Sequence, residues 1–525
     1  MMLNIIISLF LFVATSILAL GNTPKQPNLI VYMIDDLGWN QISAKQVTMG
    51  THTGSFITPN IEKIANKGLS FTHAYTQPNC APSRAAMLSG QYPARVNNSV
   101  YVVGNLNRNK KPGITKEKAQ FIGPTQREDV ASLAITIAEA LKKNGYNTAH
   151  IGKYHVGGHS TEETMPENQG FDINIGGYKQ GHQPVCFSKK VNDVWQFTGL
   201  GRGDFDRFAR PYTQSYVEKF RISKSQIGQP KHICDALADA MDETVKNLSA
   251  KDKPFYLQIH AYAVHGPVKS RPDLKEKAHQ KLSSKKSNQS NLAGFISGMD
   301  AVLGRLLLSL DDPNHDGNEV DSIANNTLIL FTSDNGGTHS NNLPLRGVKG
   351  MFTEGGIRVP LVAYWPTVIP SNRISDRMVH GIDFYPTLLE LAGNQWLPSK
   401  KTHPLDGESF AGILRNPSLK ARRSPIFYLF PGYMDIRAQP CVVIIDEIQN
   451  KRYKLFYYYE KNSWELYNLS DDIGEETNLI DSHPKTASKL SRKIQDWLTQ
   501  KHPTWIPKYP LAKKDRKPVM PKFFH

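Results

Sequence analysis

The sequence contains few cysteines, and it lacks internal repeats and long low-complexity segments. Only four cysteines occur among 525 residues, namely Cys80, Cys186, Cys234 and Cys441. So few cysteines in so long a chain exclude a disulfide framework, even in an oxidising compartment. Beyond the N-terminal region no segment is expected to cross a bilayer, so we expect no integral membrane association.

The one long apolar run lies at the N-terminus. It covers residues 3–20 and is interrupted by only four polar residues, Asn4, Ser8, Thr15 and Ser16. The run is short, and the small residues around Gly21 suit a cleavage point, so we predict a signal peptide over residues 1–21, although no basic residue precedes it. No cysteine stands at the cleavage point, which argues against a lipid anchor. The mature protein is therefore expected to be exported, to the periplasm or the medium.

Acidic residues are scarce relative to basic ones. The chain has 47 Asp and Glu against 63 Lys and Arg, which gives a net charge of +16 and a pI near 9.4. A positive field of this size attracts nucleic acid, acidic membranes or sulfated and carboxylated sugars, although a basic surface without a partner is the alternative. Export makes nucleic acid a poor partner, so an anionic polysaccharide is the preferred one.

Unbroken apolar runs predict buried parallel strands in the first three quarters of the chain. They cover residues 29–34, 146–151, 255–262 and 327–332. Helical periodicity lies between them, at residues 59–67, 132–144 and 295–310, and the Thr58 hydroxyl is expected to cap the first of these helices. Residues 156–250 are weakly periodic and are expected to form long loops with scattered elements. This alternation predicts an α/β fold with a large mixed, mostly parallel sheet flanked by helices.

The sequence changes in character after about residue 415. Short strands in meander order are expected at residues 425–430, 441–446, 453–459 and 464–469, followed by a helix at residues 484–501. We therefore predict a large α/β domain over residues 22–415 and a smaller antiparallel-sheet-and-helix subdomain over residues 416–505. Residues 506–525 form a basic tail, which is either disordered or attracts polyanions to the protein.

Polar residues follow several of the predicted strands. They are Asp35 and Asp36, Lys153 to His155, His265, and Asp334 with Asn335. In doubly wound α/β proteins the ligand site lies at the carboxyl edge of the parallel strands, so these side chains should converge. Three carboxylates and an amide oxygen suit Ca²⁺ or Mg²⁺ better than Zn²⁺. Taken alone, Asp35-Asp36 also reads as an ordinary turn.

A second acidic stretch, Asp312 to Gly317, partly matches a calcium-binding loop. The glutamate expected at the twelfth position of such a loop is replaced by Ile323. We therefore expect a surface turn there.

The segment Cys80-Ala81-Pro82-Ser83-Arg84, followed by Leu88-Ser89-Gly90, resembles the signature of the formylglycine-dependent sulfatases, which are arylsulfatase-like members of the alkaline phosphatase superfamily. The resemblance extends over nearly the whole mature chain. Tyr154 stands where Trp is frequent, and Met351-Phe352 replaces a small residue pair, but neither change removes a catalytic group. A cysteine alone would more often be a buried hydrophobe.

The resemblance implies that a maturation enzyme oxidises Cys80 to formylglycine (3-oxoalanine), whose hydrate attacks the sulfur of a sulfate ester. The implied metal is Ca²⁺, with Mg²⁺ possible, held by Asp35, Asp36, Asp334, Asn335 and the converted Cys80. Arg84 would orient the hydrate, His155 would assist its proton movement and His265 would protonate the leaving alcohol. Lys153 and Lys349 would bind the sulfate oxygens. Candidate sugar or sulfate contacts are His182, His339 and Arg346.

Three hypotheses follow from the sequence. The first is an exported sulfatase acting on a sulfated polysaccharide or oligosaccharide. The second is a phosphomonoester or phosphonate hydrolase of the same superfamily, since phosphate fits a similar cation-lined cleft. The third is an inactive polysaccharide-binding protein whose Cys80 stays unmodified.

Overall fold

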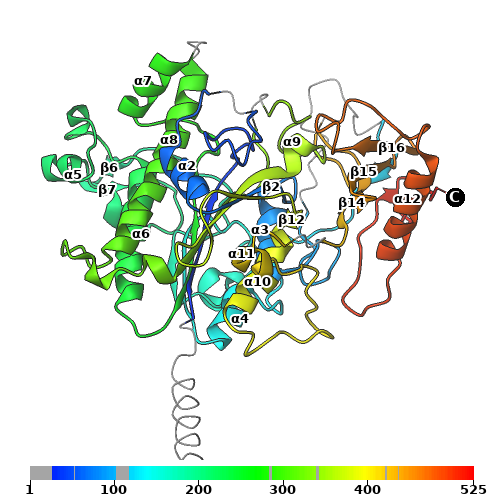
Figure 1. The fold of residues 1–525 in the computed structure, drawn as a ribbon, viewed down its shortest axis with the longest axis horizontal. Helices are drawn as coiled ribbons and strands as arrows, with labels where there is room; N and C mark the ends of the chain where they lie inside the picture. Colours follow the sequence, from blue (N-terminus) through cyan, green and yellow to red (C-terminus); the bar gives the residue numbers. More distant parts are fainter. Residues whose placement is uncertain are drawn as a thin grey trace, which may run out of the picture.

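A sheet of nine strands forms the centre of the molecule (Figure 1). The computed structural model describes residues 26–51, 54–101, 118–282, 287–338, 342–419, 423–435 and 437–524. The predicted signal peptide and His339 lie outside these ranges. In spatial order the strands are β11 (Arg373–Ser375), β2 (Leu69–Tyr75), β10 (Arg358–Tyr364), β9 (Thr327–Ser333), β1 (Asn28–Ile34), β8 (Phe255–His260), β4 (Asn147–Gly152) and β5 (Ile173–Ile175), with β12 (Val379–His380) beside β2.

The middle of this sheet is parallel. Strand β1 runs between β8 and β9 in parallel register, β4 continues the parallel set beyond β8, and β10 is antiparallel to β9 and β2. Every residue of β1, β8 and β9 is buried. Strands covered on both faces need apolar side chains in both directions, which explains the unbroken apolar runs. The predicted mixed, mostly parallel sheet is confirmed.

Helices cover both faces of the sheet, and alternate residues of β1 point to one face or the other. Ile30, Tyr32 and Ile34 share a core with α6 (Ile233–Ser249) and α8 (Ser287–Asp311). Leu29, Val31 and Met33 share the opposite core with helices that include α4 and α10. The remaining helices of the large domain are α2 (Pro59–Asn66), α3 (Cys80–Ser89), α4 (Ile137–Lys143), α5 (Gln214–Lys219), α7 (Pro272–Lys281), α9 (Glu354–Ile357), α10 (Phe384–Leu391) and α11 (Ala411–Arg415).

Three of the helix predictions need correction. Helix α6 lies inside the region expected to be mostly loop, and it is a regular helix that buries one apolar face against α8 and the sheet. Helix α4 starts at Ile137 rather than Ser132, because Thr136 and Glu139 form a capping box that defines the first turn. The Thr58 hydroxyl does not cap α2; it accepts a hydrogen bond from the Ser43 amide at 2.8 Å.

Helix α8 begins earlier than predicted, and by length and composition alone it could cross a membrane. This differs from the expectation that no segment beyond the N-terminal run has that property. However, 67% of its most apolar window is buried inside the molecule, where it packs against α6, α7 and α2. That burial is the pattern of a core helix.

The C-terminal part forms a separate antiparallel sheet. Its strands are β13 (Ile426–Phe430), β14 (Cys441–Ile448), β15 (Lys451–Tyr458) and β16 (Ser463–Asn468), paired in chain order as predicted. Helix α12 (Pro484–Leu498) packs on one face through residues that include Leu490, Ile494 and Trp497. Two small ribbons complete the structure, β6 (Lys189–Val191) with β7 (Val194–Gln196), and β17 (Leu511–Ala512) with β3 (Phe121–Ile122).

The basic tail follows the surface of this subdomain instead of being disordered. Strand β17 pairs with β3, and the amide of Phe524 donates a hydrogen bond to Ser491 Oγ at 2.9 Å. The rings of Phe523 and Phe524 also pack against the core beneath α12. The tail therefore adds its charges to a defined surface.

Buried ion pairs join the C-terminal sheet to the large domain. The ammonium of Lys454 on β15 lies 3.0 Å from carboxylate oxygens of both Glu354 and Glu475, and all three side chains are buried. Glu475 also accepts a hydrogen bond from the Glu354 amide at 2.8 Å. These contacts anchor the end of the loop that carries Lys349.

Candidate active site

The polar residues that follow the parallel strands meet at one edge of the sheet, as their order in the sequence predicted. The Asp36 amide after β1 donates to Asp334 Oδ1 after β9 at 3.1 Å, and Asn335 Nδ2 donates to Asp36 Oδ1 at 2.7 Å. Lys153, which directly follows β4, places its ammonium 2.5 Å from Asp35 Oδ2. Adjacent parallel strands end at the same edge, so residues about 300 positions apart become direct neighbours.

Cys80 reaches this edge from the first residue of α3. Its sulfur and carboxylate oxygens of Asp35 and Asp36 all lie within 4.8 Å of one another. Lys349 Nζ donates to Cys80 Sγ at 3.1 Å and lies 2.6 Å from Asp36 Oδ1. The Cys80 side chain is buried, with 4% of the residue exposed. The motif cysteine and the strand-end carboxylates therefore belong to one cluster.

Arg84 holds α3 against the ends of the strands. It lies one turn after Cys80, on the same side of the helix. Its Nη2 and Nε donate to Asp334 Oδ2 at 2.8 and 3.1 Å, and its Nη1 donates to the Lys153 carbonyl at 2.6 Å. Such charge-assisted contacts to the planar guanidinium fix both the position and the orientation of the Arg84 side chain. Arg84 thereby sets where Cys80 sits relative to the carboxylates.

The charges in the cluster balance. Three carboxylates, those of Asp35, Asp36 and Asp334, face three cations, those of Arg84, Lys153 and Lys349. Burial by itself would raise the pKa of Asp334, but Arg84 and the two lysines hold it well below its usual value. For Asp35, burial and the neighbouring Asp334 prevail and raise the pKa.

The Cys80 and Lys349 side chains show the same competition between burial and neighbouring charge. Burial raises the pKa of the Cys80 thiol to about 12, although Lys153 and Lys349 oppose that shift. Burial alone would lower the pKa of Lys349, but Cys80 and Asp36 outweigh it and raise the pKa. The Cys80 and Lys349 side chains thus each offset part of the effect of burial on the other.

Three oxygens in the cluster fit a hard metal ion. Asp35 Oδ1, Asp36 Oδ2 and Asn335 Oδ1 are buried and have no hydrogen-bond partner among the described residues. Buried polar atoms are almost always paired, so three unpaired acceptors in one place fit the ligand set of a cation. Asp334 Oδ2 already accepts two hydrogen bonds from Arg84, whereas Oδ1 accepts only one, from the Asp36 amide, and keeps a lone pair for a metal. An all-oxygen set of this kind suits Ca²⁺ or Mg²⁺.

Two histidines border the cluster. His155 is partly buried, and its ring packs against Gly181, where a Cβ atom would lie only 2.5 Å from the ring nitrogen Nε2. Burial, and then Lys153 and Arg84, lower the pKa of His155 well below its usual value. His265 Nε2 lies 3.8 Å from Asp36 Oδ2, and its ring stacks on His182 at 5.7 Å between centroids. Burial and the charge of Lys349 lower the pKa of His265 to about 4.

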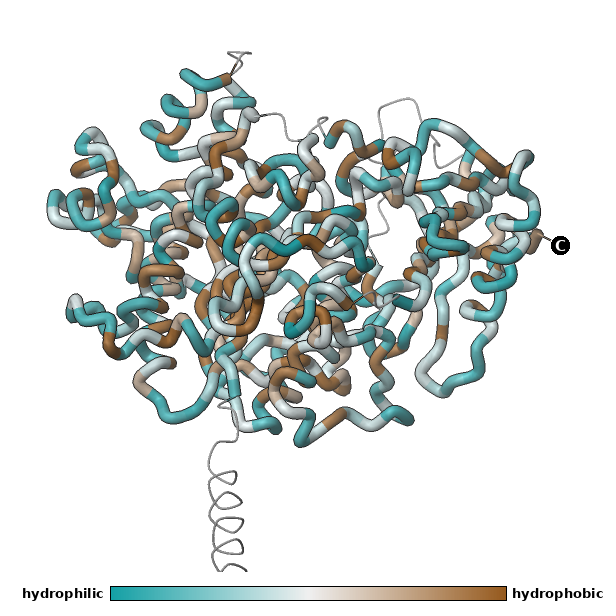
Figure 2. Tube along the Cα trace, viewed as in Figure 1, coloured by the Kyte–Doolittle hydropathy of each residue, from teal (hydrophilic) through white to brown (hydrophobic). Residues whose placement is uncertain are grey.

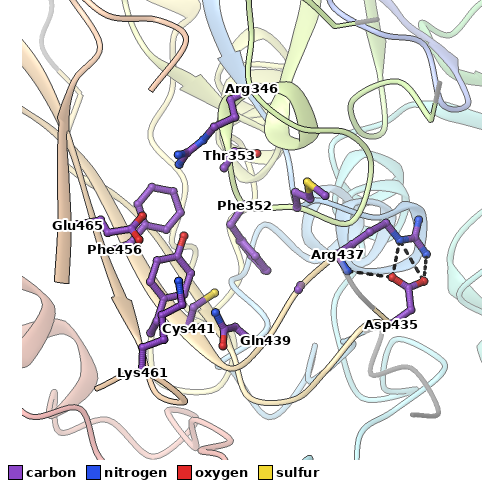
Figure 3. A pocket seen from close by; sticks show the side chains of 13 residues that line it. Arg346, Phe352, Thr353, Asp435, Arg437, Gln439, Cys441, Phe456, Lys461 and Glu465 are labelled. Carbon is purple, nitrogen blue, oxygen red and sulfur yellow. Dashed lines mark hydrogen bonds and ion pairs between the residues drawn. The ribbon is translucent and has the colours of Figure 1, made fainter. Parts of the chain in front are cut away.

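A pocket of about 450 Å³ lies beside the Lys349 loop, between that loop and the C-terminal sheet (Figure 3). Arg346, a candidate sugar contact, lines it together with Phe352, Arg437, Tyr458, Lys461 and Glu465. Arg437 pairs with Asp435 and donates from Nη1 to the Lys349 carbonyl at 3.3 Å. Sequence reasoning missed Arg437 and Lys461, because they lie in irregular segments beside β14 and β15 and belong to no motif.

Comparisons with known proteins cover nearly the whole chain. A family model described as Sulfatase matches residues 27–394, and one described as N-sulphoglucosamine sulphohydrolase, C-terminal, matches residues 348–503. A protein named Sulfatase from Formosa agariphila is 39% identical over 545 residues, which cover 97% of each chain. N-acetylgalactosamine-6-sulfatase from Canis lupus familiaris is 27% identical over 90% of this chain and 80% of its own length.

Solved structures show the same architecture. The structure of Ps i-CgsB in complex with k-i-k-neocarrahexaose matches with a TM-score of 0.66 and 25% identity, over 92% of this chain and 95% of the other. The structure of PsFucS1 sulfatase from Pseudoalteromonas sp. matches with a TM-score of 0.60 and 23% identity, over 91% and 92%. The likeness therefore includes both the large sheet and the C-terminal sheet.

Proposed function

The chain belongs to the sulfatase family, and we propose that it hydrolyses sulfate esters of a sulfated carbohydrate at the cluster around Cys80. It is a sulfuric ester hydrolase. The proposal adds the residue roles, the conversion of Cys80 to formylglycine, the metal, the carbohydrate substrate and export. The observation that carries it is the meeting of the motif cysteine with three strand-end carboxylates and two buried lysines.

The charge balance of the cluster supports an anionic substrate. The three carboxylates and three cations cancel, so a bound divalent cation leaves a surplus of two positive charges. A sulfate monoester carries one negative charge and gains charge on its leaving oxygen during hydrolysis. Preorganised positive charge in a buried site stabilises that change more than water does. The cluster thus supplies positive charge to both the bound substrate and the transition state.

Formylglycine supplies a nucleophile with two hydroxyl groups, which a cysteine or serine side chain lacks. The residues around position 80 orient its side chain and place positive charge beside it. Arg84 keeps α3 in place through Asp334, and Lys349 lies against the side-chain atom of residue 80. Lys153 and Lys349 hold the sulfate oxygens, and His155 assists proton movement at residue 80.

His265 is the group that donates a proton to the leaving alcohol. Its ring lies at the outer side of the cluster, next to Asp36 and the exposed His182. Its pKa of about 4 applies to the cluster without substrate. A sulfate anion beside the ring opposes that shift, because negative charge favours the imidazolium. General acid help of this kind contributes about 10²–10⁴ in rate.

Calcium is the metal we propose for Asp35, Asp36, Asp334, Asn335 and the converted residue 80, with Mg²⁺ as the alternative. We expect a strong chelator to remove activity and to lower the melting temperature, because a metal that binds only the folded protein stabilises it, and its removal leaves buried oxygens without a partner. Adding Ca²⁺ should restore both. The melting curve is followed by circular dichroism with and without each metal. An enzyme whose activity and melting temperature ignore the chelator would contradict a metal at this cluster.

A carbohydrate substrate is supported by the pocket beside Lys349. It offers aromatic faces, cations and polar groups directly next to the lysine proposed to hold sulfate. Arg346 and His182 are the proposed sugar contacts; His339 remains a third, outside the described residues. The similar proteins include an N-acetylgalactosamine-6-sulfatase and a structure in complex with a neocarrahexaose. Both similarities support a sulfated carbohydrate as the substrate of this chain.

Export and maturation complete the proposal. The N-terminal apolar run supports secretion to the periplasm or the medium. Conversion of Cys80 requires a formylglycine-generating maturation enzyme as a partner.

The proposed function is tested by turnover of defined sulfated oligosaccharides, an aryl sulfate and an aryl phosphate. We expect release of sulfate from the aryl sulfate and from a subset of the oligosaccharides, with much slower release of phosphate. Preferred turnover of the aryl phosphate would favour the phosphomonoesterase alternative. Binding of the oligosaccharides without any release would favour the inactive polysaccharide-binding protein.

A further inference from the structure

A basic groove runs along α12, on the opposite face of the C-terminal sheet from the pocket beside Lys349. The inner residues of α12 pack on Val442, Ile444 and Leu455, whereas the pocket side of the same sheet packs Val443 and Phe456 against Phe352. Figure 1 shows α12 at the outer edge of the molecule, next to the C-terminus, with β14 and β15 on its inner side. The hydropathy colouring of Figure 2 shows polar residues along this edge. The groove is therefore separate from the catalytic cluster.

The groove has a volume of about 690 Å³ and is lined mainly by cations. Lys485, Lys489, Arg492 and Lys493 line it along the helix, with Phe524 of the tail and one carboxylate, Asp496, beside them. Lys493 is paired with Asp446 at 2.5 Å. Among the described residues, Lys485, Lys489 and Arg492 have no carboxylate within ion-pair distance, and all three are exposed. Three charges on this face are thus available to a ligand.

The net positive charge of the chain is concentrated in its C-terminal residues. Residues 484–525 carry eleven Lys and Arg against two Asp, a net charge of +9 out of the chain's +16. The tail is folded onto the same subdomain, and Lys522 lies two residues before the groove-lining Phe524. More than half of the excess positive charge of the protein therefore lies in α12 and the tail that follows it, whereas charges in the catalytic cluster balance.

We propose that this groove binds the chain of a sulfated polysaccharide at a point distant from the catalytic cluster. Lys485, Lys489 and Arg492 follow one another over about 10 Å of the helix axis, at 1.5 Å per residue, and form a line of charge that matches a linear polyanion. Among the described residues that line the groove, Phe524 alone is aromatic, whereas single-stranded nucleic acid sites stack several bases on aromatic rings. It also lacks the apolar face with which a helix enters a membrane.

Binding of the polymer at a second point would raise the local concentration of sulfate groups near the active site. This effect depends on the length of the substrate. A small aryl sulfate cannot reach both places and gains nothing. The inference goes beyond the proposed function, because binding at the groove does not require turnover.

The test compares two charge-matched variants of the full-length protein. The groove variant is Lys485→Gln/Lys489→Gln/Arg492→Gln. The control variant, Lys246→Gln/Lys251→Gln/Lys253→Gln, removes three exposed lysines at the end of α6 and just beyond it. The probes are dextran sulfate, uncharged dextran, double-stranded DNA and phosphatidylserine vesicles. Affinity for each is measured over a salt series, and aryl sulfate turnover and melting temperature are recorded for both variants.

We expect the groove variant to bind dextran sulfate about 10- to 100-fold more weakly at low salt, with a smaller salt dependence, because three ion contacts are lost. The control variant should keep the wild-type affinity, and both should keep the aryl sulfate activity. Equal losses in the two variants would overturn the proposal, because only net charge would then matter. Undiminished binding of dextran sulfate by the groove variant would overturn it, as would a loss confined to DNA or vesicles.

Discussion

Replacing Cys80 by Ala lowers kcat/KM for an aryl sulfate by about 10⁴-fold or more, the range found when a catalytic nucleophile is removed. The reason is chemical, because in the described part of the chain Cys80 is the nucleophilic side chain that lies beside Lys349 and the two aspartates. An alanine there also keeps α3 intact, since Arg84 still joins the helix to Asp334. The variant should therefore fold and bind substrate while losing turnover.

The matched control for this variant is Cys234→Ala. Cys234 is a buried cysteine of α6 that packs near Gly298, away from the cluster, and its replacement should change kcat/KM little. Mass spectrometry of the Cys80 peptide from the native host completes the experiment and should detect an aldehyde in place of the thiol. A wild-type enzyme that is fully active with an unaltered thiol would contradict formylglycine at this position.

Replacing Lys349 by Met lowers kcat/KM by about 10²–10³, the loss typical for one preorganised charge in a dry site. Lys349 is the cation that contacts both Cys80 and Asp36, so its loss leaves Asp36 without its cation and removes positive charge from the sulfate site. Lys349→Arg should recover only part of the activity, because a planar guanidinium does not fit the space of an ammonium. Steady-state kinetics on an aryl sulfate measure both variants.

Lys451→Met is the control for the lysine variants. Lys451 forms an exposed ion pair with Asp471 on the C-terminal sheet, and such pairs contribute about 0–1 kcal/mol. Its kinetics and melting temperature should match the wild type. If Lys349→Met retained full activity at an unchanged melting temperature, Lys349 would have no part in holding the substrate.

Helix α6 shows where the sequence was insufficient for the fold. Its apolar residues have helical spacing, but the surrounding stretch is rich in glycine and polar residues, and the local signal was weak. The helix is stabilised by its packing against α8 and the sheet, which are separate segments that a local window of the sequence does not include. The start of α4 illustrates the opposite case, because its capping box is local and could have been read from Thr136 and Glu139.

The pocket and the α12 groove also depend on tertiary structure. Arg437 and Arg346 are 91 positions apart, and they line one pocket only because the C-terminal sheet packs against the Lys349 loop through Lys454, Glu354 and Glu475. The basic tail had two readings in the sequence. Its packing on the C-terminal subdomain excludes the disordered tail, and the attraction of polyanions stays a prediction.

The sequence by itself determined that buried, mostly parallel strands form the large sheet and which polar residues follow four of them. Buried parallel strands must be apolar throughout, and polar residues that follow them must meet where the strands end. Only the tertiary structure decided which atoms pair, which oxygens stay unpaired and which distant loops share a surface. Those outcomes depend on side-chain packing between segments that are hundreds of residues apart. No local pattern of residues encodes that packing.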